Sequence, residues 1–112
     1  MSRLTEKATA FVTAIVNGDA GTAHEMLISD LSREISAADL TTQLDAMADD
    51  MGGVTKVGDA AIILEEWPGK TENELAMVYV PLEGDVYSEA ITLTLAKSGD
   101  ELRISRIEWG RP

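Results

Sequence analysis

The acidic side chain best placed for proton transfer is Glu89. Along its predicted strand Glu89 shares an alternation with Tyr87 and Ile91, so it points to the same face as apolar neighbours. Burial among such neighbours raises the pKa of a carboxyl group towards neutrality, which is how a general acid or base is made. In the alternative interpretation, Glu89 lies at a strand end or bulge and forms a salt bridge with Arg103 or Arg106.

Three other side chains are candidates for acid–base chemistry. Tyr79 and Tyr87 lie on predicted strands and could act together with Glu89. An unperturbed histidine has a pKa of about 6.5, so the single histidine, His24, would suit proton transfer if it lined a cavity. Its position beside a polar helix face equally fits a histidine at the surface.

A second set of residues could bind a ligand without reacting with it. Trp67, Tyr79 and Trp109 are spaced so that they could line the mouth of a pocket for a small apolar molecule. The alternative is that these aromatic side chains are part of the core.

Composition excludes several kinds of site. The chain has no cysteine and one histidine, so thiol chemistry and a His-based metal site are excluded, and no Gly-x-Ser-x-Gly motif is present. Asp45, Asp49 and Asp50 lack the spacing of a calcium loop. Gly52-Gly53 follows a helix, whereas a phosphate-binding glycine loop follows a strand. We therefore predict no metal and no cofactor.

The charge of the chain is strongly acidic. The formal net charge is −11, and the acidic residues are spread over both halves. Such a field repels phosphate backbones and anionic lipid headgroups, so nucleic acid and membrane surfaces are not expected partners. The acidity fits a highly soluble surface; adaptation to high salt and a basic partner are the alternatives.

At 112 residues the chain has the size of one domain, residues 1–112. No interdomain linker or repeat interrupts it. No apolar run approaches the roughly 18 residues of a membrane span, and the first amphipathic stretch is interrupted by charge at Glu6 and Lys7. We expect a cytoplasmic protein.

The first half of the chain has helical periodicity. Apolar stripes predict helices over about residues 3–17, 20–28 and 37–51, with Asp19 and Ser36 as N-caps and Asn17-Gly18 as a stop. Residues 28–35 are interpreted as an irregular connection.

After Gly52-Gly53 the period becomes that of strands, predicted over about residues 54–67, 74–82, 86–97 and 101–109. The run of residues 60–64 is interpreted as core. In the last strand, apolar residues change face between Ile104 and Ile107, which a bulge near Ser105-Arg106 would reconcile. The sequence therefore predicts an α+β fold with three helices on a curved four-stranded antiparallel sheet.

The strand over residues 74–82 is apolar on both faces. Three helices can cover only one of them, so the second face needs another cover. We expect a second copy of the chain, giving a homodimer through the sheet face. A sheet curled tightly enough to shield itself is the alternative.

The order of elements resembles a known superfamily. A first helix with an aromatic stripe ends in an Asn-Gly-Asp turn, a third helix closes on Gly-Gly, and the last strand ends at Trp109. The quoted segments are Phe11-Val12-Thr13-Ala14-Ile15-Val16-Asn17-Gly18-Asp19 and Leu102-Arg103-Ile104-Ser105-Arg106-Ile107-Glu108-Trp109. The pattern is similar to the nuclear transport factor 2-like, or cystatin-like, α+β cone superfamily, and most of all to small bacterial members of unknown function, which also occur fused to hydrolases or in lipoproteins.

This resemblance implies a cone that holds a ligand, a protein partner or an active site. Isomerase members use a carboxylate base with a tyrosine and a protonated acid; neither Tyr79 nor Tyr87 has the flanking sequence that would align it. SnoaL-like and dehydratase members often place a histidine in the cone, whereas His24 lies on the second predicted helix.

Two hypotheses follow. The first is a binding or interaction domain, homodimeric, with a small apolar ligand in its cone. The alternative is a cofactor-independent lyase or isomerase of the ketosteroid isomerase or SnoaL-like kind, which would use an inward carboxylate such as Glu89 with Tyr79 or Tyr87.

Overall fold

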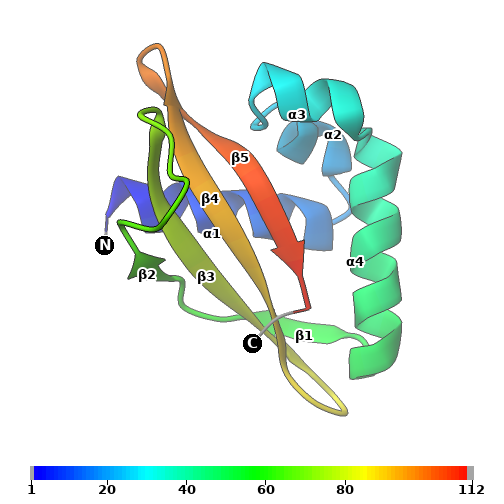
Figure 1. Ribbon diagram of the computed structural model, residues 1–112. Helices are drawn as coiled ribbons and strands as arrows, with labels where there is room; N and C mark the ends of the chain where they lie inside the picture. The colour runs from blue at the N-terminus through cyan, green and yellow to red at the C-terminus, as the bar shows by residue number, and fades with distance from the viewer. Residues whose placement is uncertain (1, 111–112) are drawn as a thin grey trace.

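The computed structural model describes residues 2–110 and has an α+β fold, which confirms the predicted class (Figure 1). The helices are α1 (Arg3–Val16), α2 (Ala20–His24), α3 (Ser29–Glu34) and α4 (Ala37–Met51). The strands are β1 (Val54–Val57), β2 (Ala61–Leu64), β3 (Glu74–Gly84), β4 (Glu89–Ser98) and β5 (Glu101–Trp109). They form one antiparallel sheet of order β1-β3-β4-β5, with β2 also paired to β3.

Helix ends follow the predicted capping. The Asp19 side chain accepts the backbone N–H of Thr22, so it caps α2. Ser36 and Asp39 form a reciprocal capping box at the start of α4. Gly52 ends α4 in the left-handed conformation, with φ of 80°, which glycine adopts without steric cost.

The connection between the second and third predicted helices differs from the expectation. Residues 29–34 form the short helix α3, and the predicted helix 20–28 ends at His24. After a turn at Glu25 and Met26, Leu27 forms a parallel bridge to Ile104 of β5: Ile28 N donates to Ile104 O at 2.9 Å, and Ile104 N donates to Met26 O at 2.8 Å. Pairing with β5 therefore replaces the last helical turn.

The predicted strand over residues 54–67 is two short strands, which is why the sheet has five strands rather than four. The break lies at Gly58, whose backbone N–H donates to Pro81 O at 2.8 Å. A Cβ at Gly58 would lie 2.9 Å from Pro81 Cγ, so only glycine fits this approach. The prediction that the apolar run of residues 60–64 lies in the core is wrong for β2, because all four residues of this strand are exposed.

The predicted bulge is confirmed. Thr94 opposes Arg106 while Leu95 opposes Ile104, so Ser105 is an extra residue in β5.

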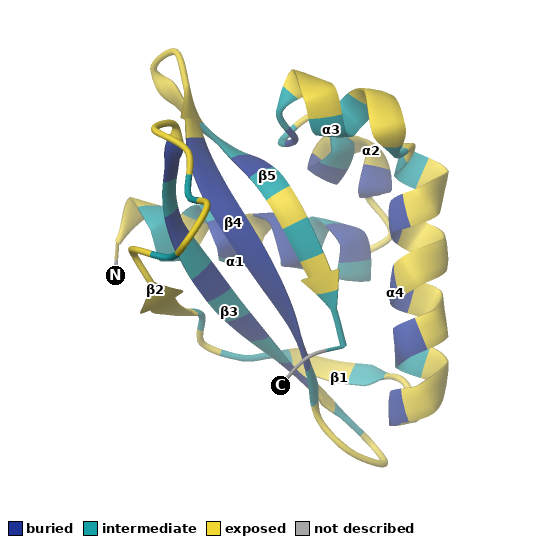
Figure 2. Ribbon diagram, in the orientation of Figure 1, coloured by how far each residue is buried: buried dark blue, intermediate teal, exposed yellow. Residues whose placement is uncertain are grey.

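The helices pack on one face of the sheet, with α1 behind it and α4 alongside in Figure 1. Between them lies one hydrophobic core, in which Phe11, Leu40 and Leu93 are almost fully buried. Figure 2 shows the result: β4 is buried nearly throughout, while β3 alternates between buried and half-buried residues. Within residues 2–110 no helix is long and apolar enough to cross a membrane.

Candidate functional site

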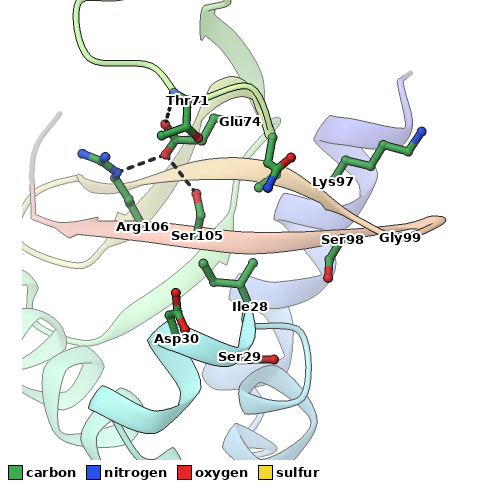
Figure 3. A pocket seen from close by; sticks show the side chains of 12 residues that line it. Ile28, Ser29, Asp30, Thr71, Glu74, Lys97, Ser98, Gly99, Ser105 and Arg106 are labelled. Atoms are coloured by element: carbon green, nitrogen blue, oxygen red, sulfur yellow. Dashed lines mark hydrogen bonds and ion pairs between the residues drawn. The ribbon is translucent and has the colours of Figure 1, made fainter.

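An open groove of about 650 Å³ lies beside the β4–β5 hairpin (Figure 3). It is lined by the end of the β2–β3 loop, by the start of α3, and by residues of β4 and β5. Polar side chains dominate the lining, among them Thr71, Glu74, Ser105 and Arg106.

Glu74 is the centre of the polar contacts in this groove. Only 4% of its surface is exposed. Its carboxylate accepts from Thr71 N at 3.0 Å, from Ser105 Oγ at 3.3 Å and from Arg106 Nε at 3.1 Å. The two oxygens thus tie the β2–β3 loop and β3 to β5.

These contacts fix the charge of Glu74. Burial alone would raise the pKa of its carboxyl group, but the Thr71 and Ser105 hydrogen bonds and the Arg106 guanidinium outweigh burial and lower the pKa below the ordinary 4.5. Glu74 is therefore ionised at neutral pH, and a carboxylate held by three donors is a structural anchor rather than a proton donor.

A smaller pocket of about 190 Å³ lies between α4 and β5, lined by Leu40 and Gln43 of α4 and by Trp109 of β5. Asp39, Thr42 and Gln43 of its lining are exposed, so the pocket opens to the surface. Pockets for small molecules usually have roughly 300–1,000 Å³. Within residues 2–110, no three His, Asp or Glu side chains are grouped closely enough to hold a metal ion.

The arrangement of helices and sheet matches a solved structure. A Campylobacter jejuni protein, described as NTF2-like and provisionally as a transpeptidase, aligns over 94% of this chain and 99% of its own with a TM-score of 0.61, at 18% sequence identity. The chain has the nuclear transport factor 2-like fold. No protein-family model matches the sequence, and no curated protein matches it.

In this NTF2-like fold, Glu89 is the first residue of β4, and Tyr87 lies in the turn just before it. Glu89 opposes Leu82 on the helix-facing side and is half-buried beside Gly110. Tyr87 is 45% exposed. Partial desolvation, followed by the carboxylates of Asp50 and Glu89, raises the pKa of the Tyr87 phenol, so the phenol stays protonated at neutral pH.

Arg103 and Arg106, the two salt-bridge partners considered for Glu89, pair with other acidic residues. Arg106 opposes Thr94 on the face away from the helices and pairs with Glu74. Arg103 pairs with Glu101 at 2.7 Å.

Tyr79 is separated from Glu89 by the sheet itself. It opposes Thr92, on the face away from the helices, whereas Glu89 faces α4. Of the predicted acid–base set, Glu89 and Tyr87 therefore lie near each other, and Tyr79 lies apart from both.

His24 has a structural place. Its Nε2 lies 3.1 Å from Ser32 O and 2.8 Å from Ile35 O, so the imidazole donates to carbonyl groups at the end of α3. The ring joins α2 to α3 outside the three hollows described for this surface.

The two tryptophans lie in different parts of the fold. Trp109 opposes Ile91 and lines the small pocket between α4 and β5. Trp67 lies in the β2–β3 loop, where its Nε1 is buried without a hydrogen-bond partner among the described residues and Lys70 Nζ is 5.8 Å from the ring centroid.

Sequence reasoning missed Glu74 because of a bulge. Glu74 opposes Ala96 and Ala76 opposes Leu95, so Leu75 is unopposed. Simple alternation places Glu74 and Ala76 on one face, and the bulge separates them. The signal available in the sequence was that Glu74, an acidic residue, shares its alternation with the apolar residues Ala76 and Val78.

Proposed function

We propose that the chain is a non-catalytic interaction domain that works as a homodimer through the helix-free face of the sheet. We call this surface the open face; its apolar members are Leu75, Met77, Tyr79 and Pro81. The observation that carries the proposal is their half-buried state in the monomer, whereas the alternate β3 residues are fully covered by the helices. Apolar rows left partly in water favour association.

A second copy of the chain suits this face by charge. Arg106 and Glu108 flank the apolar row from β5, opposite Thr94 and Thr92. In the proposed dimer, a two-fold axis between these residues would bring each Arg106, which also pairs with Glu74 of its own chain, beside the Glu108 of the other copy. Both side chains are exposed in the monomer, so the pairing adds specificity more than affinity.

The placement of the candidate residues supports an interaction role over the lyase or isomerase alternative. Acid–base catalysis needs groups that converge on one substrate in a cavity. Glu89 and Tyr79 lie on opposite faces of the sheet, and Tyr87, the tyrosine near Glu89, is 45% exposed. The pocket between α4 and β5 is below the usual size for a ligand. The small apolar ligand and the cytoplasmic location stay predictions.

Transpeptidase chemistry, named for the Campylobacter jejuni protein, is not carried over to this chain. It needs an activated nucleophile with a nearby base. This chain has no cysteine, and His24 is engaged by two backbone carbonyl groups.

Sedimentation equilibrium tests the proposal. We expect a dimer at micromolar concentration, and we expect Tyr79→Lys to raise the dissociation constant by at least about tenfold, or about 1.4 kcal/mol. Ala46→Lys, which adds the same charge on the exposed side of α4, is the control and should change the dissociation constant less than about twofold.

Glu108→Arg is a second, fully surface variant, in case Tyr79→Lys loses stability. It places like charges together across the proposed axis and should also weaken the dimer. A wild-type monomer at several hundred micromolar would overturn the proposal, and so would a dimer that neither variant weakens.

A further inference from the structure

The strand β2 forms an uncovered edge of the sheet. It pairs with β3 on one side, and no strand within residues 2–110 pairs with its other side. In Figure 2 it is exposed along its whole length. Ile62, Ile63 and Leu64 are 36%, 48% and 44% exposed, although they are large apolar side chains.

This edge lacks the side-chain features that prevent strand addition. Natural edge strands are often guarded by lysine, proline or an inward-pointing charge, because an unpaired backbone is a template for another strand. The sequence Ala61-Ile62-Ile63-Leu64 contains no charge and no proline, and isoleucine favours extended backbone. Its backbone guards are its length of four residues and a register shift that leaves Ile63 unopposed by β3, so only a short segment can be added.

The charges beside β2 indicate what could cover it. Asp59 precedes the strand, and Glu65 and Glu66 follow it. All three are exposed, and of the three only Glu66 has an ion-pair partner among the described residues, Lys70 at 3.1 Å. An added strand therefore meets negative charge at both ends of an apolar centre.

A second copy of β2 is disfavoured by these charges. Antiparallel pairing centred between Ile62 and Ile63 places Asp59 opposite Glu66, and parallel pairing in register places each acid beside itself. Like charges directly opposite each other destabilise strand pairs. The net charge of −11 adds to the repulsion between copies.

We propose that the β2 edge binds an extended segment of a different protein, with apolar side chains in its centre and lysine or arginine at both ends. The segment adds to the sheet as a further strand, so main-chain hydrogen bonds supply affinity and the flanking charges supply selectivity. This interface uses the backbone edge of β2, which adjoins the open face because Ala61 and Leu64 pair with Tyr79 and Met77, and it goes beyond the proposed dimer.

Two synthetic peptides test the charge selectivity. The first is Lys-Arg-Val-Ile-Val-Val-Arg-Lys, and the second replaces its four basic residues with glutamate. In fluorescence anisotropy titrations with the full chain, we expect saturable binding of the basic peptide and at least about tenfold weaker binding of the acidic one. Equal affinities, or no binding of the basic peptide up to about 1 mM, would overturn the proposal.

Two lysine variants test the location. Ile63→Lys should weaken binding of the basic peptide by at least about tenfold, since it adds a positive charge to the edge. Val86→Lys is the matched control in the β3–β4 turn, where an apolar side chain is 70% exposed, and should weaken binding less than about threefold.

Three outcomes separate this inference from its competitors. Equal effects of Ile63→Lys and Val86→Lys mean that the peptide does not bind at β2, which refutes the proposal. A dimer that Ile63→Lys abolishes without peptide and that Tyr79→Lys leaves intact identifies a second copy as the occupant of β2, which also refutes it. Retained peptide binding in Tyr79→Lys supports it whether or not the dimer through the open face exists.

Discussion

The two edges of the sheet are finished in different ways. At β5 the segment after α2 pairs with the strand through Met26, Ile28 and Ile104, and Arg103 Nη1 donates to Glu25 O at 2.6 Å. At the other edge β2 has no such cover within the described residues, and its apolar side chains face solvent.

This difference separates an edge that contributes to stability from the edge proposed to bind a partner. Ile104 is fully buried, its backbone N–H and C=O both bond to the segment after α2, and it opposes Leu95 of β4. Ile63 is of the same residue type, yet it is 48% exposed and unopposed. Exposed apolar residues on an edge strand are typical of a surface that another chain covers, which is the basis of the proposal for β2.

The largest expected effect compares two isoleucines. Ile104→Ala should lower the free energy of unfolding by about 2–5 kcal/mol, because it leaves a cavity in the core. Ile63→Ala should lower it by less than about 0.5 kcal/mol, because its side chain is already half in water. Urea unfolding followed by circular dichroism measures both. Similar losses would show that β2 is as much part of the core as β5.

The next effect concerns the arginine that holds the β5 edge. Arg103→Ala should lower the free energy of unfolding by about 1 kcal/mol, since it removes hydrogen bonds to Glu25 O and Leu27 O. Arg33→Ala, which removes an exposed pair with Asp30, should change it by less than about 0.5 kcal/mol. Equal effects in urea unfolding would mean that Arg103 does not hold the edge.

Acid should weaken the contacts by which Glu74 joins β3 and the β2–β3 loop to β5. The folded-state pKa of Glu74 is lowered below its ordinary 4.5, so its contribution to stability is present above that value and is lost as the pH falls through the folded pKa. Glu74→Gln should therefore flatten the loss of stability below about pH 4.5 compared with the wild type. Glu72→Gln, an exposed neighbour, is the control. Parallel acid curves for wild type and Glu74→Gln would contradict the anchor role.

Salt should act in opposite directions on the two proposed interfaces. Each copy carries −11, so raising the salt concentration screens repulsion and should strengthen the dimer a few-fold. Binding of the basic peptide at β2 should weaken over the same range, because its attraction is screened. Sedimentation and anisotropy measured in the same buffers give both trends. Trends of the same sign would contradict at least one of the two charge arguments.

Local signals in the sequence predicted much of the fold. Ser36 with Asp39 marks the start of α4, Gly52 its end, and the phase change between Ile104 and Ile107 predicted the bulge at Ser105. Each depends on residues close together in the chain, where capping and alternation act.

Features that depend on distant partners were missed. Glu74 is held by Ser105 and Arg106, which lie 31 and 32 residues away. The apolar run of β2 has the composition of a core strand, and only the order of strands shows that it lies at an edge. For the same reason Tyr79 and Glu89 could not be assigned to opposite faces of one sheet from the sequence.

Hydrogen exchange with and without the basic peptide tests the central contrast most directly. In the free protein, amides of residues 26–28 and Ile104 should exchange slowly, and the fragment covering residues 59–66 should exchange quickly. The peptide should slow exchange in residues 59–66 by at least about tenfold and leave residues 26–28 unchanged. Slow exchange of β2 in the free monomer, or no change when the peptide binds, would contradict an open edge that binds a partner strand.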